Sequence, residues 1–459
     1  MTLKRPTLAT GLALLVWLLA AWPCSAEGTT PEAVGKAYSL DDLYDLALAR
    51  AEAVKIAREN VVIARKDKTR ALSVLIPSVT AFGSYTLSDT DQATDPVLPS
   101  ESFDLKTGAL GWGLRFDQSF TLNGRELIAL DISRDQITRS ETDLTTVQER
   151  YLLEVATAYF QVLRAAKGLE ISKASVARLE KHRDYVAARL KLDDVTKTDM
   201  YRAESELSDA RAALIADQNR HLRSQAALMS LVDLPEHFVL KEPDGAGPEQ
   251  AAAGVEPLLG QGLALRPEIR SAELDRVVAE KSVDLTQGDR WPVLSIEGQY
   301  AWSDEANEGT LGGAALDYDK DISGYSLAAK LSFTLFDGGL KRAETAQARA
   351  RERQARHALD ETKKKVVLDI RDAYLNLSTQ KGQLASLSDK LAFARENYRS
   401  VSEMYRHGLA NSVDMMDANT LLVSSERELS DAQYGYQLAV LALKRATGER
   451  LAPGGTGKE

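Results

Sequence analysis

Apolar and polar residues alternate along the stretch that begins at Tyr325. One side of the alternation carries Tyr325, Leu327, Ala329, Leu331, Phe333 and Leu335, and the other carries Ser326, Ala328, Lys330, Ser332 and Thr334. A period of two is typical of a β-strand with one apolar face and one hydrated face. Patterns of this kind predict four strands, at about 78–88, 110–122, 293–303 and 323–336.

Between the strands, apolar residues recur at steps of three and four. Leu152, Val155, Tyr159 and Val162 show this spacing, which favours amphipathic helices that pack as coiled coils. The pattern predicts helices at about 40–74, 125–191, 198–232, 255–290, 338–407 and 413–447. The second of these helices would be about 100 Å long. The fold class is therefore expected to be mixed but mainly α.

The order of elements occurs twice in the sequence. Pro77 ends one helix before a strand, and Pro292 does the same 215 residues later. The apolar spacing of the long helix recurs at the same offset, where Tyr374 corresponds to Tyr159. These features predict two tandem structural repeats, at 27–238 and 255–448, each with two strands and long coiled-coil-like helices. A linker at 239–254 would join them, and a flexible tail at 449–459 would follow.

The first 26 residues are expected to be a secretory signal peptide. Two basic residues precede the apolar run Leu12–Ala21, and Cys24-Ser25-Ala26 forms a small-residue cleavage site. Lipidation of Cys24 is the alternative, although Trp22-Pro23 stands where a lipoprotein signal has small residues. Cleavage after Ala26 removes the one cysteine of the chain, which excludes disulfides and thiolate metal sites.

Charge and histidine placement narrow the function classes. The formal net charge is −10 and becomes −12 once Lys4 and Arg5 leave with the signal peptide, so a nucleic acid partner is not expected. The five histidines are scattered without ligand spacing, and no glycine-rich segment has the lysine and spacing of a phosphate loop. We therefore expect no enzyme activity, no cofactor and no metal.

The four predicted strands, of about 11 residues each, have the length needed to cross a bilayer on a tilt. No apolar run after Ala26 approaches the roughly 18 residues of a membrane helix. Four strands cannot close a barrel, because spanning barrels have about eight or more. Closure would need oligomerisation, and a trimer would supply twelve strands. A soluble protein with two β-hairpins and coiled-coil helices is the alternative.

Three short motifs complete the pattern. Leu335-Phe336-Asp337-Gly338-Gly339 follows the fourth strand, whereas Tyr405-Arg406-His407-Gly408 and Val413-Asp414-Met415-Met416-Asp417-Ala418 flank a break between helices. Together with the doubled strand–helix layout, these motifs make the chain resemble the TolC-like outer-membrane efflux proteins. The resemblance covers essentially the whole mature chain.

The resemblance implies a homotrimer in the outer membrane of a Gram-negative bacterium. Its strands would form a 12-stranded β-barrel in contact with outer-membrane lipid, and its helices an α-helical tunnel that extends into the periplasm. Such a channel is the passive exit duct of a tripartite efflux pump or type I secretion system. A periplasmic adaptor (membrane fusion) protein connects it to an inner-membrane RND or ABC-type transporter. A periplasmic coiled-coil adaptor or scaffold is the alternative function.

The same resemblance assigns a periplasmic gate. Asp414 and Asp417 match the carboxylates that ring the entrance of the family's tunnel. They lie three residues apart on one helix face, where an ordinary hydrated surface is the alternative interpretation. In a trimer, three such pairs would surround a narrow pore and attract cations. The family can carry an arginine where this chain has Ala410, so a latch built on that arginine is not expected.

Two further sets of residues are expected at the ends of the helices. The breaks at 192–198 and 408–412 would form hairpin tips that contact the adaptor or pump, with plain helix turns as the alternative. The residues of the two tips are Asp193, Asp194, Val195, Gly408, Leu409 and Ala410. Gly408 suits a position with positive φ, and Asp193 occupies the matching position of the first repeat. Strand-to-helix turns are expected at Asn123, Gly124, Asp337, Gly338 and Gly339.

Overall fold

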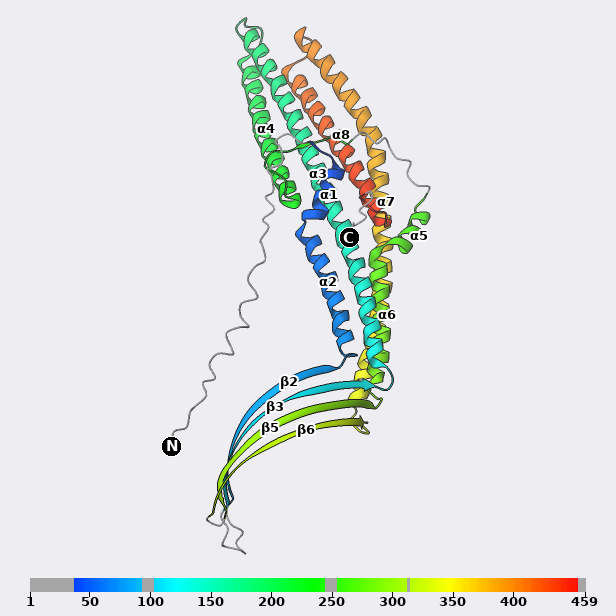
Figure 1. The fold of residues 1–459 in the computed structure, drawn as a ribbon. Helices are drawn as coiled ribbons and strands as arrows, with labels where there is room; N and C mark the ends of the chain where they lie inside the picture. The colour runs from blue at the N-terminus through cyan, green and yellow to red at the C-terminus, as the bar shows by residue number, and fades with distance from the viewer. Residues whose placement is uncertain (1–36, 93–102, 244–253, 312–313, 453–459) are drawn as a thin grey trace, which may run out of the picture.

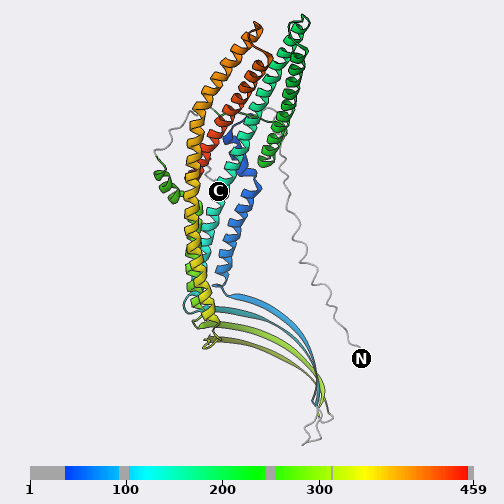
Figure 2. The same cartoon turned by 180° about the vertical axis from the view of Figure 1, so that it is seen from behind.

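The protein is a long bundle of helices with a curved sheet at one end (Figures 1 and 2). The computed structural model describes residues 37–92, 103–243, 254–311 and 314–452. The predicted signal peptide with Cys24, most of the predicted linker and the end of the predicted tail lie outside the described residues. In chain order the elements are β1 Ala37–Tyr38, α1 Leu40–Arg50, α2 Glu52–Ser73, β2 Ser78–Gln92, β3 Phe103–Thr121, α3 Arg125–Leu190, α4 Lys197–Val232, β4 Val239–Leu240, α5 Glu256–Leu265, α6 Pro267–Gly288, β5 Val293–Leu311, β6 Ala314–Ser332, α7 Leu340–Arg406 and α8 Ser412–Ala446.

Two very long helices, α3 and α7, organise the bundle. In the half far from the sheet, α3 packs between α4 and α8, and α7 packs on the other side of α8 (Figure 1). In the half near the sheet, α3 packs between α2 and α6, and α7 packs on the other side of α6. Both halves are therefore single layers of four helices, with α7 at one edge and α4 or α2 at the other.

The largest buried cluster lies where α1, α3 and α4 meet. Its fully buried members include Tyr44 of α1, Tyr159 of α3 and Leu228 of α4. Burial raises the pKa of Tyr159 to about 12, and its hydroxyl donates to the backbone oxygen of Lys241 at 2.5 Å. No described helix is both long enough and apolar enough to cross a membrane.

The four long strands form one antiparallel sheet in the order β2-β3-β5-β6. The register places Trp112 opposite Trp302 and Tyr300 opposite Tyr325, so most of the large apolar residues of the four strands share one face, with Phe82 and Ile322 among the exceptions on the other. The other face carries polar residues, among them Thr80, Arg115, Gln299 and Ser326, which are aligned across the sheet. The two-faced pattern predicted from the sequence is thus present in every strand, because partners in a ladder point the same way.

All four strands are longer than predicted at the end far from the helices, and the fourth is shorter than predicted at the end near them. β2 extends to Gln92 and β5 to Leu311, so the acidic segments beyond the predicted strand ends continue the ladder. Backbone pairing does not require apolar side chains, and Asp304 lies opposite Asp321 within it. The fourth strand was predicted to reach 336 but ends at Ser332, because its partner strand begins only at Val293, directly opposite.

Two predicted helices are each divided by a break. The predicted helix 40–74 is interrupted at Ala51 and the predicted helix 255–290 at Arg266, where ψ is 125° and 123°. Pro267 explains the second break, because a proline disfavours the helical conformation of the preceding residue. The first break lies 215 residues earlier without a proline, and no sequence feature explains it.

The first described residues of the predicted linker and tail take part in the fold. Val239 and Leu240 form β4, which pairs in parallel with β1. Leu451 is buried, and its backbone N–H donates to the Glu149 carboxylate at 3.1 Å. Burial of this carboxyl group raises its pKa. Apolar side chains that can pack against the α1–α3–α4 cluster thus extend the ordered structure beyond both predicted boundaries.

Candidate functional site

The two helix hairpins end in turns of the same geometry. After α3 the left-handed residue is Asp193, with φ of 58°, and after α7 it is Gly408, with φ of 72°. The residue that follows each of them donates its N–H to a carbonyl five residues earlier. Asp194 donates to Arg189 at 3.1 Å, and Leu409 donates to Met404 at 2.8 Å. This bond closes the C-terminus of each helix in the Schellman manner. The positive φ predicted for Gly408 is present.

The next helix of each hairpin begins with a capping box. Thr196 and Asp199 form it at the start of α4, and Asn411 and Asp414 form it at the start of α8. The Asp414 carboxylate accepts the N–H of Asn411 at 3.0 Å, while the Asn411 side chain accepts the N–H of Asp414 at 3.0 Å. At α4, hydrogen bonds from the hydroxyl and N–H of Thr196 hold the pKa of Asp199 below its usual value. Asp414 therefore has a helix-capping role that its counterpart shares.

Asp417 has no such structural role. Its side chain is exposed one turn after the cap, and Asp414 is exposed as well, whereas Met415 and Met416 between them are buried. Both carboxylates thus lie on the face of α8 that turns away from the rest of the chain. That the two line a gate remains a prediction, and Asp417 carries it without the competing capping role.

Aromatic and guanidinium groups tie the two tips together. Arg189 of α3 lies over the rings of Tyr185 and Tyr405, at 5.7 and 5.8 Å from the ring centroids, and pairs with Asp194 at 2.6 Å. The Tyr185 hydroxyl donates to the backbone oxygen of Arg406 at 3.3 Å. Cation–π contacts of this kind contribute roughly 0.5–2 kcal/mol each. They connect the α3–α4 hairpin to the α7–α8 hairpin at their ends.

A buried histidine adds to this contact between the hairpins. The ring of His182 lies 5.0 Å from that of Tyr405, and its Nε2 is 3.4 Å from the hydroxyl of Ser412. Burial lowers the pKa of His182, so the ring is neutral near pH 7. The sequence did not single out His182, Tyr185 or Arg189, because their partners lie more than 200 residues away.

The predicted contact residues at the tips divide into two groups. Asp193, Asp194, Gly408 and Leu409 are exposed, whereas Val195 and Ala410 are partly buried and pack against the cluster around Tyr405 and Met416. Leu192 was not among the predicted contacts, yet it is 78% exposed, like Leu409 at 77%. An apolar residue directly after a helix end is the sequence signal that could have identified it.

The strand-to-helix turns lie at the opposite end of the helices. Gly124 precedes α3 with φ of 72°, and Gly338 and Gly339 precede α7 with φ of 66° and 92°. The Asn123 side chain accepts the N–H of the first α3 residue at 3.2 Å, and the Asp337 carboxylate accepts the N–H of Gly339 at 2.9 Å. Side-chain acceptors and glycines thus turn the chain from sheet to helix before both α3 and α7. Within the described ranges, no three histidine or carboxylate groups are placed to hold a metal.

Comparison with known proteins agrees with this architecture. The sequence profile of the family described as outer membrane efflux protein matches residues 43–232 and 258–449, one match for each half of the chain. The chain belongs to this family. Outer membrane protein TolC of Vibrio cholerae serotype O1 is 25% identical over 436 residues, which is 94% of this chain and 95% of that protein. Outer membrane efflux protein BepC of Brucella suis biovar 1 is 24% identical over 406 residues, 87% and 81% of the two chains.

The fold is shared with solved structures of outer-membrane proteins. The crystal structure of the outer membrane protein VceC from Vibrio cholerae superposes with a TM-score of 0.71 and 18% identity, covering 89% of this chain and 96% of that one. As a member of the outer membrane efflux family, the chain is an outer-membrane channel protein of efflux or secretion. This assignment sets aside the periplasmic adaptor or scaffold that the sequence left as an alternative. The family is one of channels and not of enzymes.

Proposed function

We propose that three copies of the chain close head to tail into a continuous channel. The observation that carries this proposal is the pair of open edges on the described structure. β2 and β6 each have a strand on one side only, and the edge helices beside them expose apolar side chains. Along the β2 edge these are Ile56 and Ile63 of α2 and Ile215 and Leu222 of α4; along the β6 edge they are Leu368, Leu375 and Phe393 of α7.

The two edges differ from each other, which favours a head-to-tail assembly over one built on a two-fold axis. Unlike edges join head to tail, and such contacts form a ring when the rotation closes. The strands of the sheet bend strongly along their length (Figures 1 and 2). A ring of three would give a barrel of twelve strands and a tunnel of helices beside it. Two copies would give a barrel of only eight strands. Three copies would place twelve helices around the tunnel, which leaves a wider passage for conduction.

The faces of the sheet support insertion of this barrel into a membrane. Along β5 the apolar face runs from Leu294 to Trp302 and is followed on the same face by Asp304, which lies opposite Asp321. The ten residues from Val293 to Trp302 rise about 33 Å, or about 23 Å on a tilt of roughly 45°. This matches the outward apolar band of about 25 Å in known barrels. The acidic ends of the strands would then project from the membrane.

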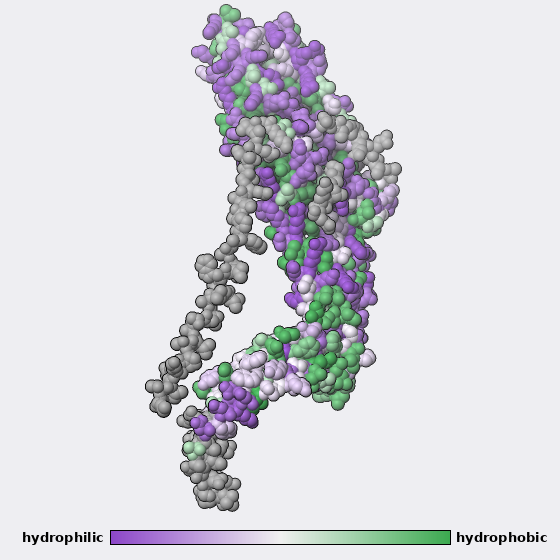
Figure 3. All heavy atoms as spheres, in the orientation of Figure 1, coloured by the Kyte–Doolittle hydropathy of each residue, from purple (hydrophilic) through white to green (hydrophobic). Residues whose placement is uncertain are grey.

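A second apolar zone surrounds the base of the helices. Figure 3 shows hydrophobic residues gathered where the helices meet the sheet, whereas hydrophilic residues cover the far part of the described sheet. Leu335 and Phe336 are 87% and 88% exposed at this junction. Large apolar side chains left in water are unfavourable, so a lipid interface is their fitting surroundings. The junction would mark the inner boundary of the bilayer.

The opposite end of the bundle would be the periplasmic entrance of an exit duct. The exposed tip residues, with Leu192 and Leu409 as apolar anchors, would contact a periplasmic adaptor or an inner-membrane RND or ABC-type transporter. Asp414 and Asp417 would surround the closed entrance, and the Arg189–Tyr405 contacts would hold the two hairpins together in that state. The channel itself would be passive, since no described site suggests a source of energy.

Planar-bilayer recordings on the purified protein test the proposal. We expect heat-labile trimers in detergent that conduct ions as single channels. Leu368→Asp places a charge on the α7 edge and should abolish the trimer, whereas Asn376→Asp adds the same charge to a polar, exposed position of that helix and should not. Monomeric protein without conductance, or equal behaviour of the two variants, would contradict the head-to-tail assembly.

A further inference from the structure

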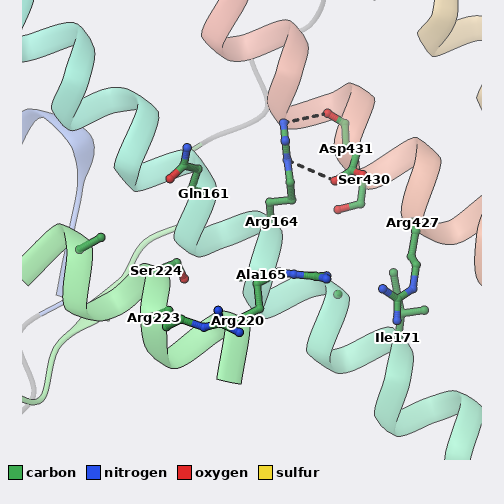
Figure 4. A pocket seen from close by; sticks show the side chains of 12 residues that line it. Gln161, Arg164, Ala165, Ile171, Arg220, Arg223, Ser224, Arg427, Ser430 and Asp431 are labelled. Carbon is green, nitrogen blue, oxygen red and sulfur yellow. Dashed lines mark hydrogen bonds and ion pairs between the residues drawn. The ribbon is translucent and has the colours of Figure 1, made fainter. Parts of the chain in front are cut away.

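A pocket with four arginines lies between α3, α4 and α8, away from the tips and from the sheet. It has a volume of about 660 Å³. Arg164 comes from α3, Arg220 and Arg223 from α4, and Arg427 from α8 (Figure 4). The channel function proposed above does not use any of these side chains.

The carboxylates around the pocket neutralise only part of this charge. Arg164 pairs with Asp431 at 3.2 Å, and Arg220 and Arg427 share the buried Asp217 at 2.8 and 2.5 Å. Among the described residues, Arg223 has no carboxylate within ion-pair distance, and its guanidinium donates to a backbone oxygen of its own helix. Four guanidinium groups thus face two carboxylates, which leaves two positive charges in excess.

A buried hydroxyl without a partner is the second, independent observation. Ser430 lines the same pocket and is only 6% exposed, yet its Oγ has no hydrogen-bond partner in the described structure. Buried hydroxyls are nearly always paired, because an unpaired one loses the hydrogen bonds that water provided. A ligand with acceptor oxygens would supply the missing partner.

We propose that this pocket binds an anion of the phosphate class. Guanidinium groups present paired N–H donors that match the oxygens of a phosphate, and a serine hydroxyl completes such a site. The volume exceeds the need of a bare ion and suits a small molecule that carries one or two phosphate groups. Because the site joins α3, α4 and α8, its ligand would bridge the two hairpins of the chain. This role goes beyond the proposed channel and does not depend on it.

Isothermal titration calorimetry of the full chain in detergent, at constant ionic strength, tests the site. The probes are inorganic pyrophosphate for a free anion and glycerol 3-phosphate for a lipid headgroup. We expect saturable binding of at least one of them, weakened about tenfold or more by Arg223→Gln. Arg202→Gln removes the same charge from an exposed position of α4 outside the pocket and should leave binding unchanged.

Ser430→Ala separates a ligand contact from a structural role. Because the hydroxyl is unpaired, its removal should leave the melting temperature of the ligand-free protein unchanged or slightly raised, while pyrophosphate binding weakens several-fold. Absence of saturable heat for both probes up to millimolar concentration would overturn the proposal. Equal losses of binding in Arg223→Gln and Arg202→Gln would also overturn it, since they would indicate unspecific attraction.

Discussion

The buried carboxylate of Asp217 on α4 interacts with side chains from α3, α4 and α8. Its side chain is 3% exposed, and its carboxylate pairs with Arg427 of α8 and Arg220 of α4, while Ser172 of α3 donates a hydrogen bond to it. The Arg427 guanidinium also donates to the Ser172 hydroxyl at 2.6 Å. Asp217→Asn keeps the shape of the side chain but removes its charge. The variant therefore isolates the electrostatic contribution to the attachment of α8.

The expected magnitude follows from the exposure of the partners. Loss of one member of a fully buried ion pair destabilises a protein by about 3–5 kcal/mol. Here the Arg427 side chain remains 31% exposed and that of Arg220 63% exposed, so both can regain water. Solvent screening lowers the expected loss to about 2 kcal/mol. A loss of that size raises the population of local openings about 30-fold.

Amide hydrogen exchange along α4 and α8 measures this population directly. Asp209→Asn, at an exposed position of α4, is the matched control and should change exchange by less than twofold. A double variant of Asp217→Asn with Arg427→Met should lose less than the sum of the single variants, because no unpaired guanidinium remains. If Asp217→Asn exchanges like Asp209→Asn, the carboxylate does not hold the three helices together.

Three further predictions concern the entrance and the sheet. Asp417→Asn should lower the cation selectivity of single channels without loss of folded protein. An unchanged selectivity would show that this carboxylate does not belong to the gate. Asp414→Asn also alters a helix cap, so it should lower the melting temperature as well. Burial lowers the pKa of His182 in the folded protein below the value of about 6.5 in the unfolded chain. The contribution of the neutral ring to folding stability is therefore fully present above about pH 6.5 and is lost as the pH falls below it. His182→Gln should flatten the decrease in melting temperature between about pH 7 and 5. Gly113→Val places a Cβ 2.4 Å from a carbonyl oxygen of β5 and should abolish outer-membrane trimers in fractionation experiments. Gly108→Ala should retain them, because the nearest atom to its Cβ is the Tyr85 hydroxyl at 3.5 Å.

The features that sequence reasoning predicted well are those with local causes. Positive φ at Gly408 and the strand-to-helix turn at Gly124 follow from turns that a glycine makes without strain, and the two faces of the strands follow from a period of two. The break at Arg266 also had a local signal, the proline that follows it, which the continuous helical pattern obscured. Such features depend on a few neighbouring residues, so a single sequence contains them.

The missed features depend on partners far along the chain. Asp217 and Arg427 are 210 residues apart, and nothing near either of them distinguishes a buried pair from two hydrated charges. β5 continues beyond Trp302 because β6 continues beside it, although the side chains of this part of the strand are mostly polar. Leu451 is buried because it packs against the α1–α3–α4 cluster. Packing, and not local preference, sets these boundaries.

Comparison of the two halves of the chain separates what the fold requires from what is particular to each half. Asp199 and Asp414 occupy equivalent positions and cap equivalent helices, so a carboxylate there is explained by the fold alone. Asp417, in contrast, corresponds to Arg202, and both side chains are exposed at the same depth of their hairpins. The similar geometry of the two hairpins does not require opposite charges at this position. A role specific to one hairpin, such as attracting cations at an entrance, should therefore be sought at Asp417 before Asp414.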